Sequence, residues 1–140
     1  MTTVLVAIAA AAVVATPAGW LLTRRAGRIR QISPGSARHE AVDLANLGLS
    51  TGGPAVVHFS APWCGPCDRV RRVVGQVCDD LGGVAHVEID LDADPAAARR
   101  FAVLSLPTTL IFDAEGRQRY RTSAVPTASD LRCALEPLLA

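Results

Sequence analysis

Residues 55–67 read Ala-Val-Val-His-Phe-Ser-Ala-Pro-Trp-Cys-Gly-Pro-Cys. The first part of this stretch is apolar and rich in β-branched residues, which predicts a strand buried on both faces. The residues after Cys67 have a helical period, so both cysteines lie where a strand passes into the N-terminus of a helix. Unpaired N–H groups and a partial positive charge at such a position favour a thiolate, the species that attacks a disulfide.

The spacing of the two cysteines lets the second thiol reach the first after a mixed disulfide has formed. We therefore predict that Cys64, the more N-terminal and more exposed of the two, is the nucleophile and that Cys67 is the resolving thiol. Pro66 suits the first helical turn, because its φ angle is fixed and it has no N–H to leave unpaired. The competing interpretation is half of a zinc site, but the sequence lacks a second C-x-x-C or a Cys/His pair at ligand spacing. We therefore expect no metal.

The pentapeptide at residues 63–67, placed after a hydrophobic strand, resembles the active site of the thioredoxin family. The resemblance covers roughly residues 41 to 140, because the predicted strand at residues 84–90, the Asp94-Pro95 pair and the Pro107-Thr108 pair also match the family pattern. It implies an α/β thioredoxin-like fold with a central mixed sheet flanked by helices. It also implies exchange with protein disulfides, no bound cofactor, and electrons supplied by a reductase or another dithiol.

The resemblance further implies which residues surround the redox-active cysteines. On sequence alone Pro107 suits the start of a strand in either isomer, but in thioredoxin-like folds the matching proline is cis and faces the active-site disulfide. The residues expected to bind substrate are Trp63, Gly65, Pro66, Leu106, Pro107 and Thr108.

Two histidines depart from the family pattern. His58 replaces the buried Asp that precedes the C-x-x-C motif in most thioredoxins, and His86 replaces a Lys of the neighbouring strand. A neutral imidazole has an unperturbed pKa near 6.5 and can accept a proton. We hypothesise that His58 is the general base for Cys67; the alternative is that it only fills a half-polar core site. His86 is expected to be structural.

Asp68 is a further departure, since the family usually has a cation directly after the second cysteine. A nearby anion disfavours a thiolate, whereas Arg69, Arg71 and Arg72 act in the opposite direction. The residues alone leave the sign of the net effect open. Two cysteines outside the motif, Cys78 and Cys133, are predicted to have no redox role, Cys78 as a small buried hydrophobe.

The length of 140 residues allows one domain of ordinary size plus an appendage. Residues 4–22 contain no charged residue and as a helix would span about 28 Å, close to the hydrocarbon thickness of a bilayer. We predict an N-terminal transmembrane anchor at 1–23, a basic juxtamembrane linker at 24–40 and a thioredoxin-like domain at 41–140. A cleaved signal peptide is the competing interpretation, but no Lys or Arg precedes the apolar run.

Four arginines follow the apolar run directly, at positions 24, 25, 28 and 30. The positive-inside rule then predicts a single-pass protein whose catalytic domain faces the cytoplasm. A net charge of +1 argues against a nucleic-acid binder. Residues 117–122 are predicted as a polar edge strand of the domain.

Two other functions stay open at this point. The first keeps the chemistry but moves it outside the cytoplasm, where the cysteine pair would act on exported proteins. The second is a tethered binding protein that uses the groove around Pro107 with little turnover. The intact C-x-x-C motif argues against it, whereas the two histidine substitutions and Ala124, which replaces a family glycine that lines the groove, keep it open.

Overall fold

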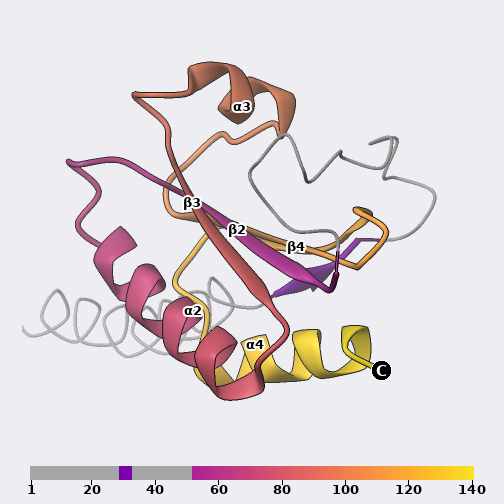
Figure 1. Ribbon diagram of the computed structural model, residues 1–140. Helices are drawn as coiled ribbons and strands as arrows, with labels where there is room; N and C mark the ends of the chain where they lie inside the picture. The colour runs from indigo at the N-terminus through magenta and orange to yellow at the C-terminus, as the bar shows by residue number, and fades with distance from the viewer. Residues whose placement is uncertain (1–28, 33–51) are drawn as a thin grey trace, which may run out of the picture.

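The computed structural model describes residues 29–32 and 52–140, and Figure 1 shows a central sheet with helices on both faces. The elements in chain order are β1 Arg30–Gln31, β2 Ala55–Ser60, α2 Cys67–Leu81, β3 Ala85–Asp90, α3 Pro95–Arg100, β4 Thr108–Phe112, β5 Gln118–Thr122, α4 Ala128–Leu135 and the 3₁₀ turn η2 Glu136–Leu138.

The five strands form one mixed sheet in the order β1-β5-β4-β2-β3. Strand β3 runs parallel to β2, whereas β4 pairs antiparallel with both β2 and β5. Because α2 crosses over between β2 and β3, these two strands can run parallel. The expected thioredoxin-like α/β fold with a mixed sheet is confirmed.

Strand β1 differs from the predicted organisation. Arg30 and Gln31 pair antiparallel with Arg121 and Tyr120 of β5, so two residues of the predicted linker belong to the sheet. As a result β5 is an inner strand and not the edge strand expected from its polar sequence. A two-residue strand has no periodic pattern of its own, and only its pairing with β5 defines it.

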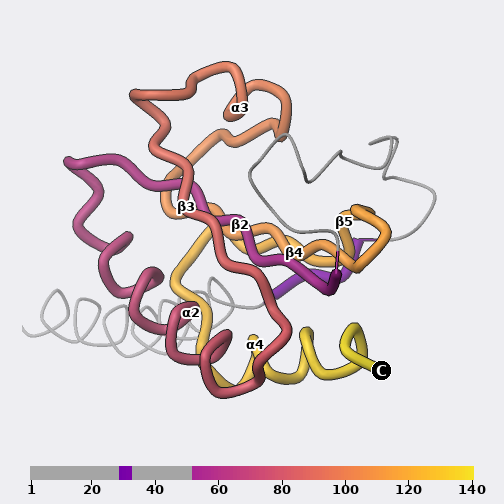
Figure 2. Tube along the Cα trace, viewed as in Figure 1, coloured from indigo at the N-terminus to yellow at the C-terminus, as the bar shows by residue number. Residues whose placement is uncertain are grey.

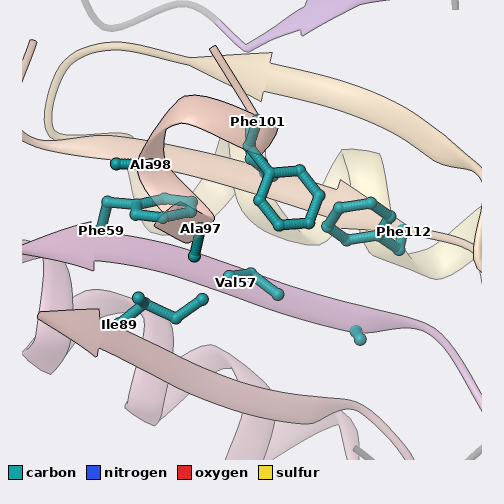
Figure 3. Close-up of a cluster of buried hydrophobic side chains, with 9 residues drawn as sticks. Val57, Phe59, Ile89, Ala97, Ala98, Phe101 and Phe112 are labelled. Carbon is teal, nitrogen blue, oxygen red and sulfur yellow. The ribbon is translucent and has the colours of Figure 1, made fainter. Parts of the chain in front are cut away.

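Two apolar clusters cover the two faces of the sheet. On one face, Val57 and Phe59 of β2 pack with Ala97, Ala98 and Phe101 from α3 and the residue that follows it. Figure 3 shows the rings of this cluster close together, and the ring of Phe101 lies 5.9 Å from that of Phe59 and 5.9 Å from that of Phe112. These aromatic contacts fix α3 against the sheet.

The other face lies beneath α2 and α4. Val56 of β2 packs there with Val70, Val74 and Val77 of α2 and with Leu131 of α4. The valines of α2 are spaced four and three residues apart, which places them on one side of the helix. Figure 1 shows α2 and α4 together on the face of the sheet opposite α3.

The Asp94-Pro95 pair begins α3: the Asp94 side chain accepts a hydrogen bond from the Ala97 N–H at 2.9 Å and so caps the helix, and Pro95 is its first residue. The predicted anchor at residues 4–22 and the predicted start of the domain at residue 41 lie outside the described residues. Within the ranges 29–32 and 52–140, no helix is long and apolar enough to cross a membrane.

Candidate active site

Cys64 and Cys67 form a disulfide where β2 passes into α2, with their Cα atoms 5.5 Å apart. The loop between them is tightly turned, since the Cys64 N–H donates to the Ala61 carbonyl at 3.0 Å and the Cys67 N–H donates to the Cys64 carbonyl at 3.1 Å. Helix α2 begins at Cys67, and no side chain caps it at Pro66. The partial positive charge of this helix N-terminus therefore lies at the cysteines, with no capping side chain to offset it.

Both cysteines are largely buried, and they differ slightly in exposure. Cys67 is 1% exposed, whereas Cys64 is 8% exposed. Cys64 is therefore the more accessible of the two to a substrate disulfide. Cys67 lies on the inner side, with its Sγ 3.9 Å from the carbonyl oxygen of Phe59.

The segment that leads into β4 packs against the disulfide from the other side. Figure 2 shows it alongside the loop between β2 and α2, and Leu106 contacts the small cluster of Ala61, Cys64 and Cys67. The Leu106-Pro107 peptide bond is cis, as the family resemblance implies. Thr108 is buried, and its hydroxyl donates to the Ser105 carbonyl at 2.8 Å, which ties the turn before the strand to the strand itself.

The rim of the site is formed by exposed residues. Trp63 is 68% exposed, and its ring N–H donates to Asp92 at 3.1 Å; Gly65 and Pro66 are also exposed. Leu104 is 94% exposed two residues before Leu106, and sequence analysis does not single it out. Its exposure depends on the turn before the cis peptide bond, so the sequence alone does not identify Leu104 as a surface residue near the active site.

An open hollow of about 530 Å³ lies beside Cys64. Its charged lining residues among those described are Asp68 and Arg71 of α2 and Glu88 and Asp90 of β3. Sequence analysis does not predict that Glu88 and Asp90 lie at the site. They do so because β2 and β3 pair in register, which sets Glu88 beside His58 and Asp90 beside Ser60.

His58 is fully buried, and its two ring nitrogens face β3. Its Nδ1 lies 2.9 Å from Nε2 of His86, and its Nε2 lies 3.5 Å from a carboxylate oxygen of Glu88. Burial lowers the pKa of His58 to about 4, and the negative charge of Glu88 offsets this only in part. Burial also lowers the pKa of His86. Both imidazoles are therefore neutral near pH 7.

No hydrogen bond joins His58 to either cysteine among the described residues. His58 lies on the same face of β2 as Val56, which packs against α2, the helix that begins at Cys67. His58 thus lies in the layer beneath the active-site helix, where it is hydrogen-bonded to His86. The sequence alone does not predict this contact.

Arg71 forms a bridge between α2 and β3. Its guanidinium donates to Asp68 at 2.7 Å and to the two carboxylate oxygens of Glu88 at 2.6 and 2.5 Å. The hydrogen bonds from Arg71 hold the pKa of Glu88 at about 2, so Glu88 is ionised throughout the neutral range. Asp68 is also paired with Arg71, one of the three arginines that the sequence analysis sets against its charge.

The remaining two cysteines lie away from the disulfide. Cys78 is buried in the cluster beneath α2, and burial raises the pKa of its thiol to about 11. Cys133 is exposed on α4. In the described part of the chain, no group of three or more His, Cys, Asp or Glu side chains is arranged to hold a metal ion.

The comparisons with known proteins agree with this geometry. The thioredoxin family model matches residues 45–136. A thioredoxin of Pyropia yezoensis is 32% identical over 102 residues, which are 72% of this chain and 89% of that protein. A thioredoxin of Mycolicibacterium smegmatis is 42% identical over 67 residues, which are 46% of this chain and 60% of that protein. The chain thus spans less than two thirds of the mycobacterial relative.

Solved structures lead to the same conclusion. The X-ray structure of Fasciola hepatica thioredoxin superposes with a TM-score of 0.59 at 28% identity and covers 70% of this chain and 93% of its own. The match to the family model, the likeness over most of the algal relative and the shared fold show that the chain belongs to the thioredoxin family.

Proposed function

We propose that this chain is a thiol–disulfide oxidoreductase that reduces disulfides of protein substrates. The observation that supports this most directly is the Cys64–Cys67 disulfide at the uncapped N-terminus of α2, packed against the cis Leu106-Pro107 peptide. A helix N-terminus favours a thiolate. The second sulfur of the pair is within bonding reach of the first, as resolution of a mixed disulfide requires.

The reaction has two steps. The Cys64 thiolate attacks one sulfur of the substrate disulfide, a Cys64–substrate disulfide forms, and the other substrate sulfur leaves as a thiolate. The Cys67 thiol then loses its proton and attacks Cys64, which forms the Cys64–Cys67 disulfide and releases the second substrate thiolate. Two electrons pass from the cysteine pair to the substrate, and a reductase or another dithiol returns them.

The exposed rim of the site supports a role in substrate binding. The exposed Trp63, Gly65 and Pro66 lie on one side of Cys64. The half-buried Leu106 lies on the other side and is followed by the buried Pro107 and Thr108. An extended segment of the substrate would lie across this rim, with its disulfide above Cys64. The exposed Leu104 adds apolar surface on the Pro107 side.

His58 is proposed to accept the proton that Cys67 releases. It is the buried titratable side chain of β2 on the face beneath α2, and it is neutral near pH 7. To accept a proton, one ring nitrogen must exchange its present contact with His86 or Glu88. If His58→Ala leaves the rate of mixed-disulfide resolution unchanged in a stopped-flow assay, this role is wrong.

The activity is tested by turnover of insulin disulfides with the full chain in detergent and dithiothreitol as the electron donor. We expect Cys64→Ser to abolish turnover and Cys67→Ser to accumulate a mixed disulfide with substrate. Cys133→Ser serves as the control and is expected to keep full activity. Partner binding without turnover would instead support the tethered binding protein.

The cellular location is a second proposal, supported by the uncharged run at residues 4–22 and the arginines that follow it. We propose that this run anchors the domain at the cytoplasmic face of a membrane. The test is labelling of reduced Cys64 by a membrane-impermeant thiol reagent. Protection until the cells are permeabilised supports the cytoplasmic side, and labelling in intact cells supports exchange on exported proteins.

A further inference from the structure

The hollow beside Cys64 is lined by more negative than positive side chains. Its lining residues include three carboxylates, those of Asp68, Glu88 and Asp90, and one guanidinium, that of Arg71. Three negative charges against one positive charge leave two net negative charges next to the sulfur that must become a thiolate. Negative charge near a thiol disfavours its ionised form, so the hollow opposes the favourable effect of the helix N-terminus.

Arg71 limits this opposition through its geometry. It lies one helical turn after Cys67, where its guanidinium reaches both Asp68 on its own helix and Glu88 on β3. Among the described residues it is the one cation that lines the hollow. Its hydrogen bonds with Glu88 and Asp68 raise its own pKa and lower the pKa of Glu88 to about 2, so the Arg71–Glu88 pair stays charged at neutral pH.

The other groups around Cys64 supply no compensating positive charge. Leu106, which packs against Cys64, is uncharged, and the Trp63 ring N–H donates a hydrogen bond to Asp92, a further carboxylate. His58 and His86 lie beneath, and burial lowers the pKa of each. Among the described residues, the charged groups that line the hollow are Asp68, Arg71, Glu88 and Asp90, whereas Arg69 and Arg72 of the same helix are exposed outside it.

We propose that Arg71 is a positioning residue that sets the reactivity of Cys64: its guanidinium pairs with the Asp68 and Glu88 carboxylates and offsets one of the three negative charges in the hollow. This inference rests on the proposed function, because it concerns the thiolate that would attack the substrate. It also gives a sign to the effect of Asp68: its charge opposes the thiolate, and Arg71 offsets that charge.

The test measures the rate at which iodoacetamide alkylates reduced Cys64 as a function of pH. All proteins carry Cys78→Ala and Cys133→Ser, and mass spectrometry locates the label. Arg71→Gln adds one net negative charge to the hollow and is expected to raise the pH midpoint of alkylation by about half a unit to one unit. Below the midpoint the alkylation rate then falls about threefold to tenfold.

Three further variants separate charge from structure. Asp68→Asn is expected to shift the midpoint in the opposite direction, to lower pH. The double variant Arg71→Gln/Glu88→Gln restores the original net charge and is expected to return the midpoint towards that of the parent. Arg72→Gln removes the same charge from an exposed position of the same helix outside the hollow and is expected to change the midpoint by less than about 0.2 units.

The proposal is overturned if Arg71→Gln shifts the midpoint no more than Arg72→Gln does, or if the double variant stays shifted like the single one. Circular dichroism of each variant checks that it is folded, and Asp68→Asn, which leaves Arg71 bound to Glu88, provides an independent reading if Arg71→Gln does not fold. Alkylation requires no substrate turnover. A failure of insulin reduction would therefore refute the proposed function and leave this result standing.

Discussion

The two faces of strand β2 differ most at the end nearer the active site. Val57 and Phe59 point to the face of α3, where the cluster is apolar over the whole length of the strand. On the opposite face Val56 is part of an apolar cluster, but His58 and Ser60 are buried polar residues that follow it towards the cysteines. One face of the strand is thus wholly apolar and stabilises the fold, whereas the other face has buried polar side chains, one of them the titratable His58, beneath the active-site helix.

The largest effect on stability is expected on the apolar face. Phe59 is fully buried and its ring packs against that of Phe101 (Figure 3). Phe59→Ala removes these contacts and leaves a cavity, so the free energy of unfolding is expected to fall by about 3–5 kcal/mol, as measured by urea denaturation. Trp63→Ala removes an aromatic ring that is 68% exposed and serves as the control, with a loss of about 0.5 kcal/mol or less. Equal losses would contradict the comparison.

The next largest effect is a pH dependence of stability, caused by His58 on the polar face of β2. The pKa of His58 is about 4 in the folded chain and about 6.5 in the unfolded chain. Between pH 4 and pH 6.5 the unfolded chain therefore binds up to one more proton than the folded chain. The contribution of neutral His58 to the free energy of unfolding is complete above pH 6.5 and is lost as the pH falls towards 4. At pH 5 the loss amounts to about 2 kcal/mol.

Urea denaturation at pH 7.5 and pH 5.0 tests this pH dependence. Wild type is expected to lose about 2 kcal/mol more than His58→Leu between the two pH values. His86 and Glu88 face the same ring and are retained in both proteins, so their own titration contributes to both. The pKa of Glu88, about 2, lies below this window. Identical losses in the two proteins would show that His58 does not resist protonation in the folded chain.

The N-termini of α3 and α2, which lie on opposite faces of the sheet, differ in how they are capped. On the apolar face Asp94 caps α3, whereas α2 has no side-chain cap at Pro66 and begins at Cys67 itself. Asp94→Ala is expected to lower the free energy of unfolding by about 1 kcal/mol without changing insulin turnover. Asp94→Asn retains a capping oxygen and should restore most of the loss. A decrease in turnover that Asp94→Asn does not reverse would mean that the α3 side contributes to catalysis.

Sequence analysis predicts the parts of this fold that depend on neighbours in the chain. The β-branched run of β2, the valine spacing of α2 and the Asp94-Pro95 start of α3 each have a local signal, and each is found in the structure. The cis isomer of Pro107 follows from the family resemblance and not from local residues, since trans is the commoner state of an X–Pro bond.

The contacts that sequence analysis misses all join residues that lie far apart in the chain. Arg71 and Glu88 are 17 residues apart, and His58 and His86 are 28 residues apart. Both contacts depend on the register of β2 against β3, which no local pattern specifies. The same reason explains β1: Arg30 and Gln31 become a strand only through their pairing with β5.

The smallest expected effect concerns Ala102, which ends the α3 region with a φ angle of 48°. This left-handed conformation is unfavourable for alanine, and two hydrogen bonds from Arg121 to the carbonyls of Phe101 and Ala102 hold the chain there. Glycine adopts it freely but loses more entropy on folding. The two effects nearly cancel, so Ala102→Gly is expected to raise the free energy of unfolding by about 0.5 kcal/mol.

Ala96→Gly provides the matched control for this last prediction. Ala96 is exposed within α3, where the same change of side chain weakens a helix and should lower the free energy of unfolding by about 1 kcal/mol. Opposite signs for one substitution at two positions six residues apart would show that the left-handed backbone at Ala102 is strained for alanine and is held by the contacts around it, among them the hydrogen bonds from Arg121. A loss at both positions would mean instead that the alanine methyl at 102 makes a contact worth more than the backbone strain, and the apolar face would then extend to the end of the turn.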